Sequence, residues 1–113
     1  MESKIYQNVA RSMENEIISG KLREGEQAPS THQVAEAHGI NAATAARGVA
    51  VLTAGGLLKK KRGVGLFVAP GARDLLVERR RSEFREQYLQ TTIQEAALLG
   101  ISKRDLIAMI MSG

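Results

Sequence analysis

The sequence predicts a mainly α-helical fold with one small β-hairpin. Two observations support this: apolar residues recur at helical spacing along most of the chain, and two short apolar segments flank a Gly-Val-Gly turn at residues 63–65. The 113 residues are enough for one domain, or for a small domain with an appendage. Because Pro70-Gly71 breaks the pattern, we expect one domain over residues 1–70 and a helical tail over residues 71–113.

The first helix is predicted over residues 4–19, where apolar side chains repeat every four residues and Gly20 follows as a stop signal. The expected buried stripe is Ile5, Val9, Met13 and Ile17, widened by Tyr6 and Ile18. Residues 21–30 then form a connector, since glycine and proline interrupt them.

Two shorter helices are predicted next. Ser30 is the expected N-cap of a helix that ends at Gly39, and Asn41 is the expected N-cap of a helix over residues 42–54. The glycine at position 48 would let a neighbouring helix approach closely. Two short helices joined by a tight turn form a helix-turn-helix, whose second helix enters a DNA major groove N-terminus first.

The predicted hairpin spans residues 57–68, and its two leading leucines are followed by four consecutive cations, Lys59 to Arg62. Residues 28–70 carry five cations and one carboxylate, so the excess positive charge of the chain lies here. A basic hairpin directly after a helix-turn-helix is a wing, which reaches DNA beside the helix. The alternative is a strand edge that uses lysine to discourage aggregation.

These elements predict three groups of residues that bind double-stranded DNA. Small side chains bring the backbone near base edges, asparagine reads adenine, a threonine methyl touches thymine, and cations neutralise phosphate. The alanines also have a plainer explanation, because alanine is the best helix former. The groups are Ser30, Thr31 and His32; Asn41, Ala42, Ala43, Thr44 and Arg47; and Lys61, Arg62, Gly63, Val64 and Gly65.

The tail is predicted to hold a long helix over residues 73–99 and a short helix that Ser102 caps together with Asp105. A helix of about 27 residues is roughly 40 Å long, more than one small domain covers. Its apolar stripe therefore favours dimerisation over a helical hairpin that completes the core. The expected dimerisation residues are Leu76, Phe84, Tyr88, Leu89, Ile93, Leu106 and Ile110.

Other classes of function find little support. The chain has no cysteine, its two histidines lie six residues apart, and no nucleophile–base arrangement is visible, so we expect no metal, no cofactor and no enzyme activity. No apolar run approaches the roughly 20 residues of a membrane span, and no signal-peptide core is present. We expect a cytoplasmic protein.

Residues 4–69 resemble the winged-helix domain of the GntR family of bacterial transcription regulators. The resemblance rests on "IYQNVARSMENEIISGKLREGEQAPS", "VAEAHGINAATAARGVAVL", "GGLL" and "RGVGLFV". The spacing I-x-S-G-x-L-x-x-G-x-x-x-P-S, followed by G-x-G-x-F-V after the third helix, is specific as a set.

Within that family, "INAATAARGV" is most similar to the small YtrA-type branch, which often carries N-P-x-T-V-x-R-A-Y. The resemblance implies that the short tail is a dimerisation unit and that a nearby transporter operon is controlled. Two frequent family arginines are missing, because His32 and Ala42 stand in their places. Base specificity is then expected to depend on Asn41, Thr44, Arg47 and DNA shape.

The leading hypothesis is a homodimeric, sequence-specific transcription regulator, expected to repress, on a two-fold-symmetric operator. The alternatives are a protein-interaction adaptor on a winged-helix scaffold and a non-specific nucleic-acid binder. The sequence indicates neither the operator nor a small-molecule effector.

Overall fold

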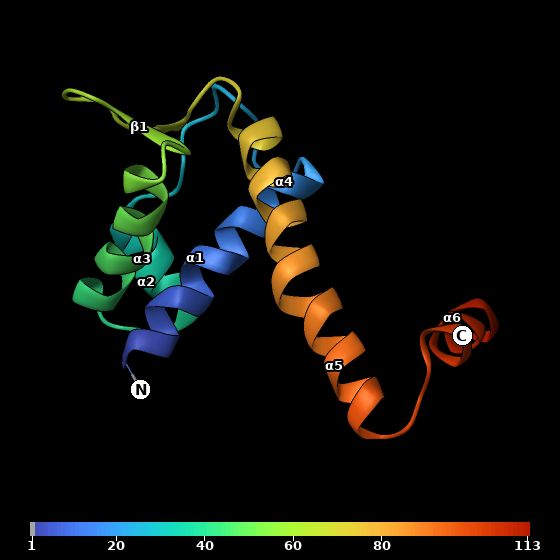
Figure 1. Cartoon of the computed structure of the whole chain (residues 1–113). Helices are drawn as coiled ribbons and strands as arrows, with labels where there is room; N and C mark the ends of the chain where they lie inside the picture. The colour runs from blue at the N-terminus through green and yellow to red at the C-terminus, as the bar shows by residue number, and fades with distance from the viewer. Residues whose placement is uncertain (1) are drawn as a thin grey trace. The chain divides into compact units, whose positions relative to one another are not determined.

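The computed structural model describes residues 2–113 and confirms a mainly helical fold with one two-stranded antiparallel hairpin (Figure 1). The chain divides into two compact units, the first ending at Val77 and the second running over Glu78–Gly113. The elements are α1 (Glu2–Ser19), α2 (Thr31–His38), α3 (Ala42–Ala54), β1 (Leu58–Lys61), β2 (Gly65–Val68), α4 (Ala72–Glu83), the π-helix η1 (Phe84–Leu89), α5 (Gln90–Leu98) and α6 (Lys103–Ser112).

In the first unit, α1 and α2 both pack against α3, and the hairpin extends away from the end of α3 (Figure 1). Apolar side chains from all of these elements share one core, in which Ile17, Leu52 and Leu57 are almost completely buried. Each such side chain contributes about 1.5–3 kcal/mol through burial. The expected stripe of α1 holds except at Ile5, which remains 42% exposed.

The helix ends follow the sequence signals. The Ser30 hydroxyl accepts from the backbone N–H of Gln33, and the Gln33 side chain accepts from the N–H of Ser30, which completes a capping box. Gly39 closes α2 in the left-handed conformation with a φ of +62°. The Asn41 side chain caps α3, as predicted.

The two strands pair in the register Leu58 with Val68 and Lys61 with Gly65. The connector before α2, predicted as loop alone, adds backbone pairing to the hairpin through an isolated bridge between Gln27 and Phe67. The carbonyl of Leu66 also accepts from the N–H of Ala28 at 2.8 Å. The wing is therefore tied to the segment that leads into α2.

The boundary between the units lies later than the predicted break after residue 70. Ala72 and Leu76, on the first turns of α4, are 1% and 2% exposed and belong to the core of the first unit. The assignment of Leu76 to dimerisation is therefore wrong, because its side chain has no surface to offer a partner. Proline and glycine mark where α4 begins, but packing decides where the unit ends.

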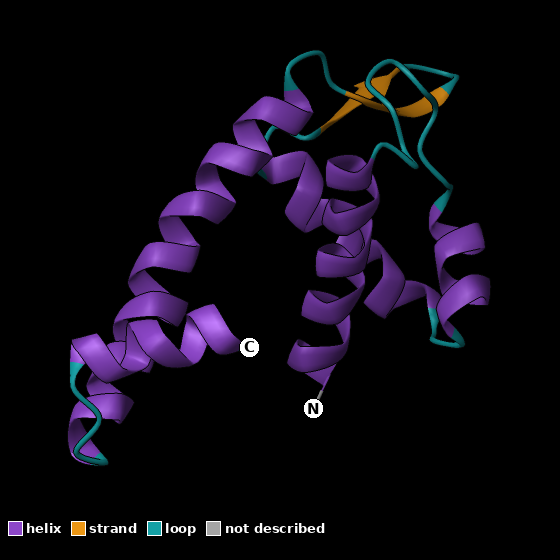
Figure 2. Cartoon of the chain, turned by 90° about the vertical axis from the view of Figure 1, so that its right-hand side faces the viewer, coloured by secondary structure: helices purple, strands orange, loops and turns teal. Residues whose placement is uncertain are grey.

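The second unit contains the end of α4, then η1, α5 and α6 (Figure 2). The predicted long helix is present, but over Phe84–Leu89 it changes to π-helical turns, where the N–H of Gln90 bonds to the carbonyl five residues earlier, that of Arg85. The last helix begins as predicted, with the Ser102 hydroxyl accepting from the N–H of Asp105 at 3.1 Å.

Candidate nucleic-acid interface

The start of α2 presents backbone and side-chain polar groups to solvent. Ser30 and His32 are exposed and Thr31 is half-buried. The first N–H groups of a helix have no acceptor within it, and the helix dipole places partial positive charge there. This end of α2 is chemically suited to meet a phosphate. His32 also faces Glu36, with Nε2 and Oε2 3.7 Å apart, so a carboxylate lies beside this expected DNA contact.

The front of α3 exposes small side chains. Ala42 and Ala43 are at the surface, which leaves room for the helix to approach base edges closely. Asn41 is also exposed, but its Oδ1 accepts from the N–H of Thr44 at 2.8 Å. A two-point contact with adenine uses both ends of the amide, so this cap competes with base reading by Asn41.

Thr44 does not take the predicted role. Its side chain is 2% exposed, within the inward stripe of α3 that also contains Ala45, Gly48 and Val49. Helical periodicity turns position 44 toward the core once positions 45 and 48 are buried. The predicted contact between its methyl group and a thymine is therefore not available in this structure.

Arg47 is the one charged residue of α3, and its side chain is exposed. Its guanidinium carbon lies 4.1 Å from the centre of the Tyr6 ring, which comes from α1. Exposed contacts of this kind between a cation and an aromatic face contribute about 0.5–1 kcal/mol. Arg47 is thus exposed to solvent and also in contact with an aromatic ring of α1.

The wing carries the other cations. Lys59, Lys60, Lys61 and Arg62 are all exposed, and Lys61 Nζ lies 4.3 Å from the centre of the Phe67 ring. The turn closes when the N–H of Val64 bonds to the carbonyl of Lys61 at 3.0 Å. Gly63 sits at the third turn position with a φ of +77°, a conformation that side chains rarely adopt.

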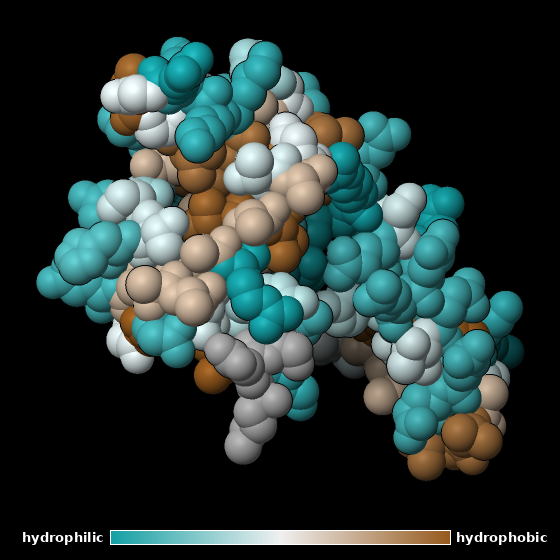
Figure 3. Space-filling view, turned by 90° about the vertical axis from the view of Figure 1, so that its left-hand side faces the viewer, coloured by the Kyte–Doolittle hydropathy of each residue, from teal (hydrophilic) through white to brown (hydrophobic). Residues whose placement is uncertain are grey.

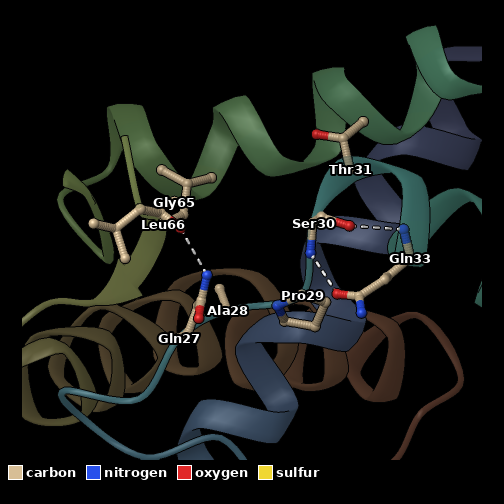
Figure 4. Close-up of a pocket in the computed structure, with 9 residues that line it drawn as sticks. Gln27, Ala28, Pro29, Ser30, Thr31, Gln33, Gly65 and Leu66 are labelled. Carbon is tan, nitrogen blue, oxygen red and sulfur yellow. Dashed lines mark hydrogen bonds between the residues drawn. The ribbon is translucent and has the colours of Figure 1, made fainter. Parts of the chain in front are cut away.

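A groove of about 580 Å³ separates the wing turn from the start of α2 (Figure 4). Its walls include Ser30 and Thr31 on one side and Val64 and Gly65 on the other. Gln27 also lines the groove, and its side chain donates to the carbonyl of Val64 at 2.9 Å. The groove is therefore lined by two residues of the first predicted group, Ser30 and Thr31, and by two of the third, Val64 and Gly65, but by none of the cations of the wing.

Sequence reasoning missed residues that support the site from outside it. Periodicity places Tyr6 only in an apolar stripe, and Gln27 falls only within the predicted connector. Their roles depend on contacts between segments far apart in the chain, which periodicity does not show. Ala46 was also missed, although its exposure beside Arg47 follows from the same helical period.

The arrangement offers donors and cations for phosphate and base edges. Among residues 4–113, whose side chains the structure describes, no three His, Asp or Glu side chains gather where they would hold a metal ion. Over the same residues, no helix combines the length and apolar character needed to cross a bilayer.

Comparisons with known proteins find matches to one family of bacterial regulators. The family model described as bacterial regulatory proteins of the gntR family matches residues 5–68. A structure from Bacteroides thetaiotaomicron, described as a transcriptional regulator of the GntR family, is 29% identical, with 96% of this chain and 94% of that chain covered and a TM-score of 0.78. None of the curated proteins compared matches the sequence.

Two further solved structures share the fold. A GntR family transcriptional regulator from Listeria monocytogenes is 24% identical, with 96% of this chain and 94% of that chain covered and a TM-score of 0.80. The BusR protein of S. agalactiae, solved in complex with its busA-promotor DNA, is 19% identical, with 94% of this chain and 54% of that chain covered and a TM-score of 0.60.

Proposed function

Because this chain belongs to the GntR family of bacterial regulatory proteins and is a DNA-binding transcription regulator, we propose that it acts as a homodimeric repressor on a two-fold-symmetric operator. The finer assignment that we favour is the small YtrA-type branch, with a nearby transporter operon as the target. The motif residues Asn41, Thr44 and Arg47 and the short tail support that branch.

One observation carries the DNA-binding part of the proposal. The polar start of α2 and the turn of the basic wing flank one groove, and the same unit exposes the small-residue face of α3 with Arg47. Hydrogen-bond donors at the start of α2 and cations of the wing are suited to bind DNA phosphates. The small residues of α3 leave room for base edges. The promoter-bound neighbour of the same fold supports DNA as the partner.

The proposal of a homodimer is supported by exposed apolar side chains in the second unit. Phe84, Tyr88, Ile107 and Ile110 are 60%, 52%, 60% and 64% exposed, and Leu98 reaches 82%. Figure 3 shows apolar atoms at the surface where α5 passes into α6. Exposed apolar side chains in this number indicate an interaction surface, and a second copy of the chain is the occupant that we propose. Two such chains would meet half-sites about one helical turn, ~34 Å, apart.

Two experiments test the proposal. Selection of bound fragments from a host-genome DNA library should return one two-fold-symmetric sequence, and sedimentation should give a dimer that Phe84→Ser together with Ile110→Ser dissociates. Surface substitutions such as Lys103→Ser serve as the matched control. Fragments without a common sequence would favour a non-specific binder, and no retained fragments would favour a protein-interaction adaptor.

The direction of regulation needs a separate readout. A reporter gene placed behind the selected operator should be expressed more strongly when the regulator is deleted. Weaker expression in the deletion strain would make the protein an activator.

A further inference from the structure

We propose that the ring of Tyr6 positions Arg47 for DNA recognition, an inference that rests on the proposed function. Tyr6 is half-buried on α1, and Arg47 is exposed on α3. The distance of 4.1 Å from the guanidinium carbon to the ring centre places the cation over the aromatic face. Tyr6 is thus a positioning residue, because it acts on DNA through Arg47.

The contact with the ring leaves hydrogen-bond donors of Arg47 available. A guanidinium is planar and carries its five N–H donors around its edge. A ring that covers one face leaves that edge free to form two parallel hydrogen bonds with guanine or with a phosphate. The ring also restricts a long side chain that would otherwise lose rotamer freedom when it binds.

Gly48 explains how Tyr6 reaches this position. A Cβ at Gly48 would lie 3.1 Å from the backbone oxygen of Tyr6 and 3.0 Å from Val9 Cγ1. The backbones of α1 and α3 therefore meet at the residue next to Arg47, so closely that a Cβ there would be tighter than in most real contacts. The glycine brings the Tyr6 ring within reach of the guanidinium one position earlier.

The wing repeats the arrangement with different residues. Lys61 Nζ lies 4.3 Å from the centre of the Phe67 ring. Of the four aromatic residues in the sequence, only Tyr6 and Phe67 fall in the first unit, and both support a cation that the sequence assigns to DNA. These two contacts indicate that the aromatic rings position cations, rather than only filling space in the core.

A double-mutant cycle tests the proposal on the full chain with the selected operator. Tyr6→Leu removes the ring, Tyr6→Phe keeps it, and each is measured alone and together with Arg47→Ala. We expect Tyr6→Leu to weaken operator binding about two- to fivefold, because the unsupported Arg47 side chain then loses more rotamer freedom when it binds. Tyr6→Phe should retain the affinity of the unchanged chain, and in the Arg47→Ala background Tyr6→Leu should have no further effect.

The outcomes separate this inference from the proposed function. If Arg47→Ala weakens binding but Tyr6→Leu does not, only the positioning role is overturned. An equal loss from Tyr6→Leu with and without Arg47 also overturns it, because the ring then acts independently of the guanidinium. If Arg47→Ala leaves operator binding unchanged, the assigned role of Arg47 fails and the inference fails with it.

Folding needs its own check. Thermal unfolding of each variant is followed by circular dichroism, so that weakened binding is compared only among folded proteins. If Tyr6→Leu lowers the melting temperature, Tyr6→Met replaces it, because methionine fills similar space without a ring face. The same pattern of coupling to Arg47 is expected.

Discussion

Gln27 Nε2 donates a hydrogen bond of 2.9 Å to the carbonyl oxygen of Val64, and so joins the connector before α2 to the tip of the wing. The two residues are 37 positions apart in the chain. A Cβ added to Gly65 would come within 2.8 Å of the same Nε2, so the glycine makes room for this contact. The wing turn is therefore held in place by a side chain that itself carries no charge.

Replacing Gln27 by alanine should weaken DNA binding without unfolding the protein. One hydrogen bond of this kind contributes about 0.5–1.5 kcal/mol, and its loss releases the wing tip. Because the wing is proposed to contact phosphates, which carry no sequence information, affinity should fall similarly for operator and scrambled duplexes in anisotropy titrations. Gln94→Ala, at an exposed glutamine of α5, is the matched control. Unchanged binding by Gln27→Ala would show that the tip needs no support.

Asn41 is expected to act on both stability and recognition, and two variants separate the roles. Asn41→Ala removes the cap of α3 and should lower the free energy of unfolding by about 1 kcal/mol in denaturant titrations. Asn41→Ser keeps a capping oxygen and should restore that stability. If Asn41 also reads a base, the serine variant still loses discrimination between operator and scrambled duplexes. Full discrimination by Asn41→Ser would limit the residue to capping.

The wing cations should contribute affinity without sequence preference. Lys61→Ala or Arg62→Ala should weaken binding to every duplex and reduce the slope of log affinity against log salt by about 1 for each phosphate that is no longer neutralised. Titrations at several salt concentrations measure that slope. Lys103→Ala removes an equal charge from the second unit and should leave the slope unchanged. A slope that stays the same in Lys61→Ala and in Arg62→Ala would exclude the wing from the interface.

The π-helical segment η1 should set which side chains face the partner chain. Phe84 and Leu89 are five residues apart, a separation that π-helical turns bring to the same side and α-helical turns do not. Deleting Gln87 should restore α-helical turns and leave Phe84 and Leu89 four residues apart, still on one side of the helix, so sedimentation should show a retained dimer. Deleting Gln94, from the α-helical turns of α5, should rotate the residues that follow by about 100° relative to Phe84 and weaken the dimer. A dimer lost on deletion of Gln87 and kept on deletion of Gln94 would contradict this role of η1.

Local signals predicted most of the fold, because caps and glycines act within a few residues. Ser30, Gly39 and Asn41 mark the ends of α2 and α3 where the structure has them. The π-helical segment was not predictable in this way, since the apolar stripe indicates a helix whether its turns are α or π.

The candidate site was predicted less completely than the fold. Arg47 and the wing cations are exposed as expected, but Thr44 is buried and Leu76 belongs to the core of the first unit. Thr44 was assigned to DNA from its position in the motif, and Leu76 to dimerisation from the apolar stripe of the tail. Tertiary packing instead buries both side chains. Tyr6 contacts Arg47, and Gln27 contacts Val64. Both contacts join segments that are far apart in the sequence, so no local pattern could reveal them.

Sequence-specific DNA binding is tested most directly by an anisotropy titration of the selected operator and a scrambled duplex of equal length at two salt concentrations. A regulator that reads sequence should prefer the operator at both concentrations, with two chains bound per duplex and a preference that Arg47→Ala reduces. Equal binding to both duplexes that disappears as salt rises would contradict recognition of the operator sequence, because attraction to phosphates alone would then explain the binding.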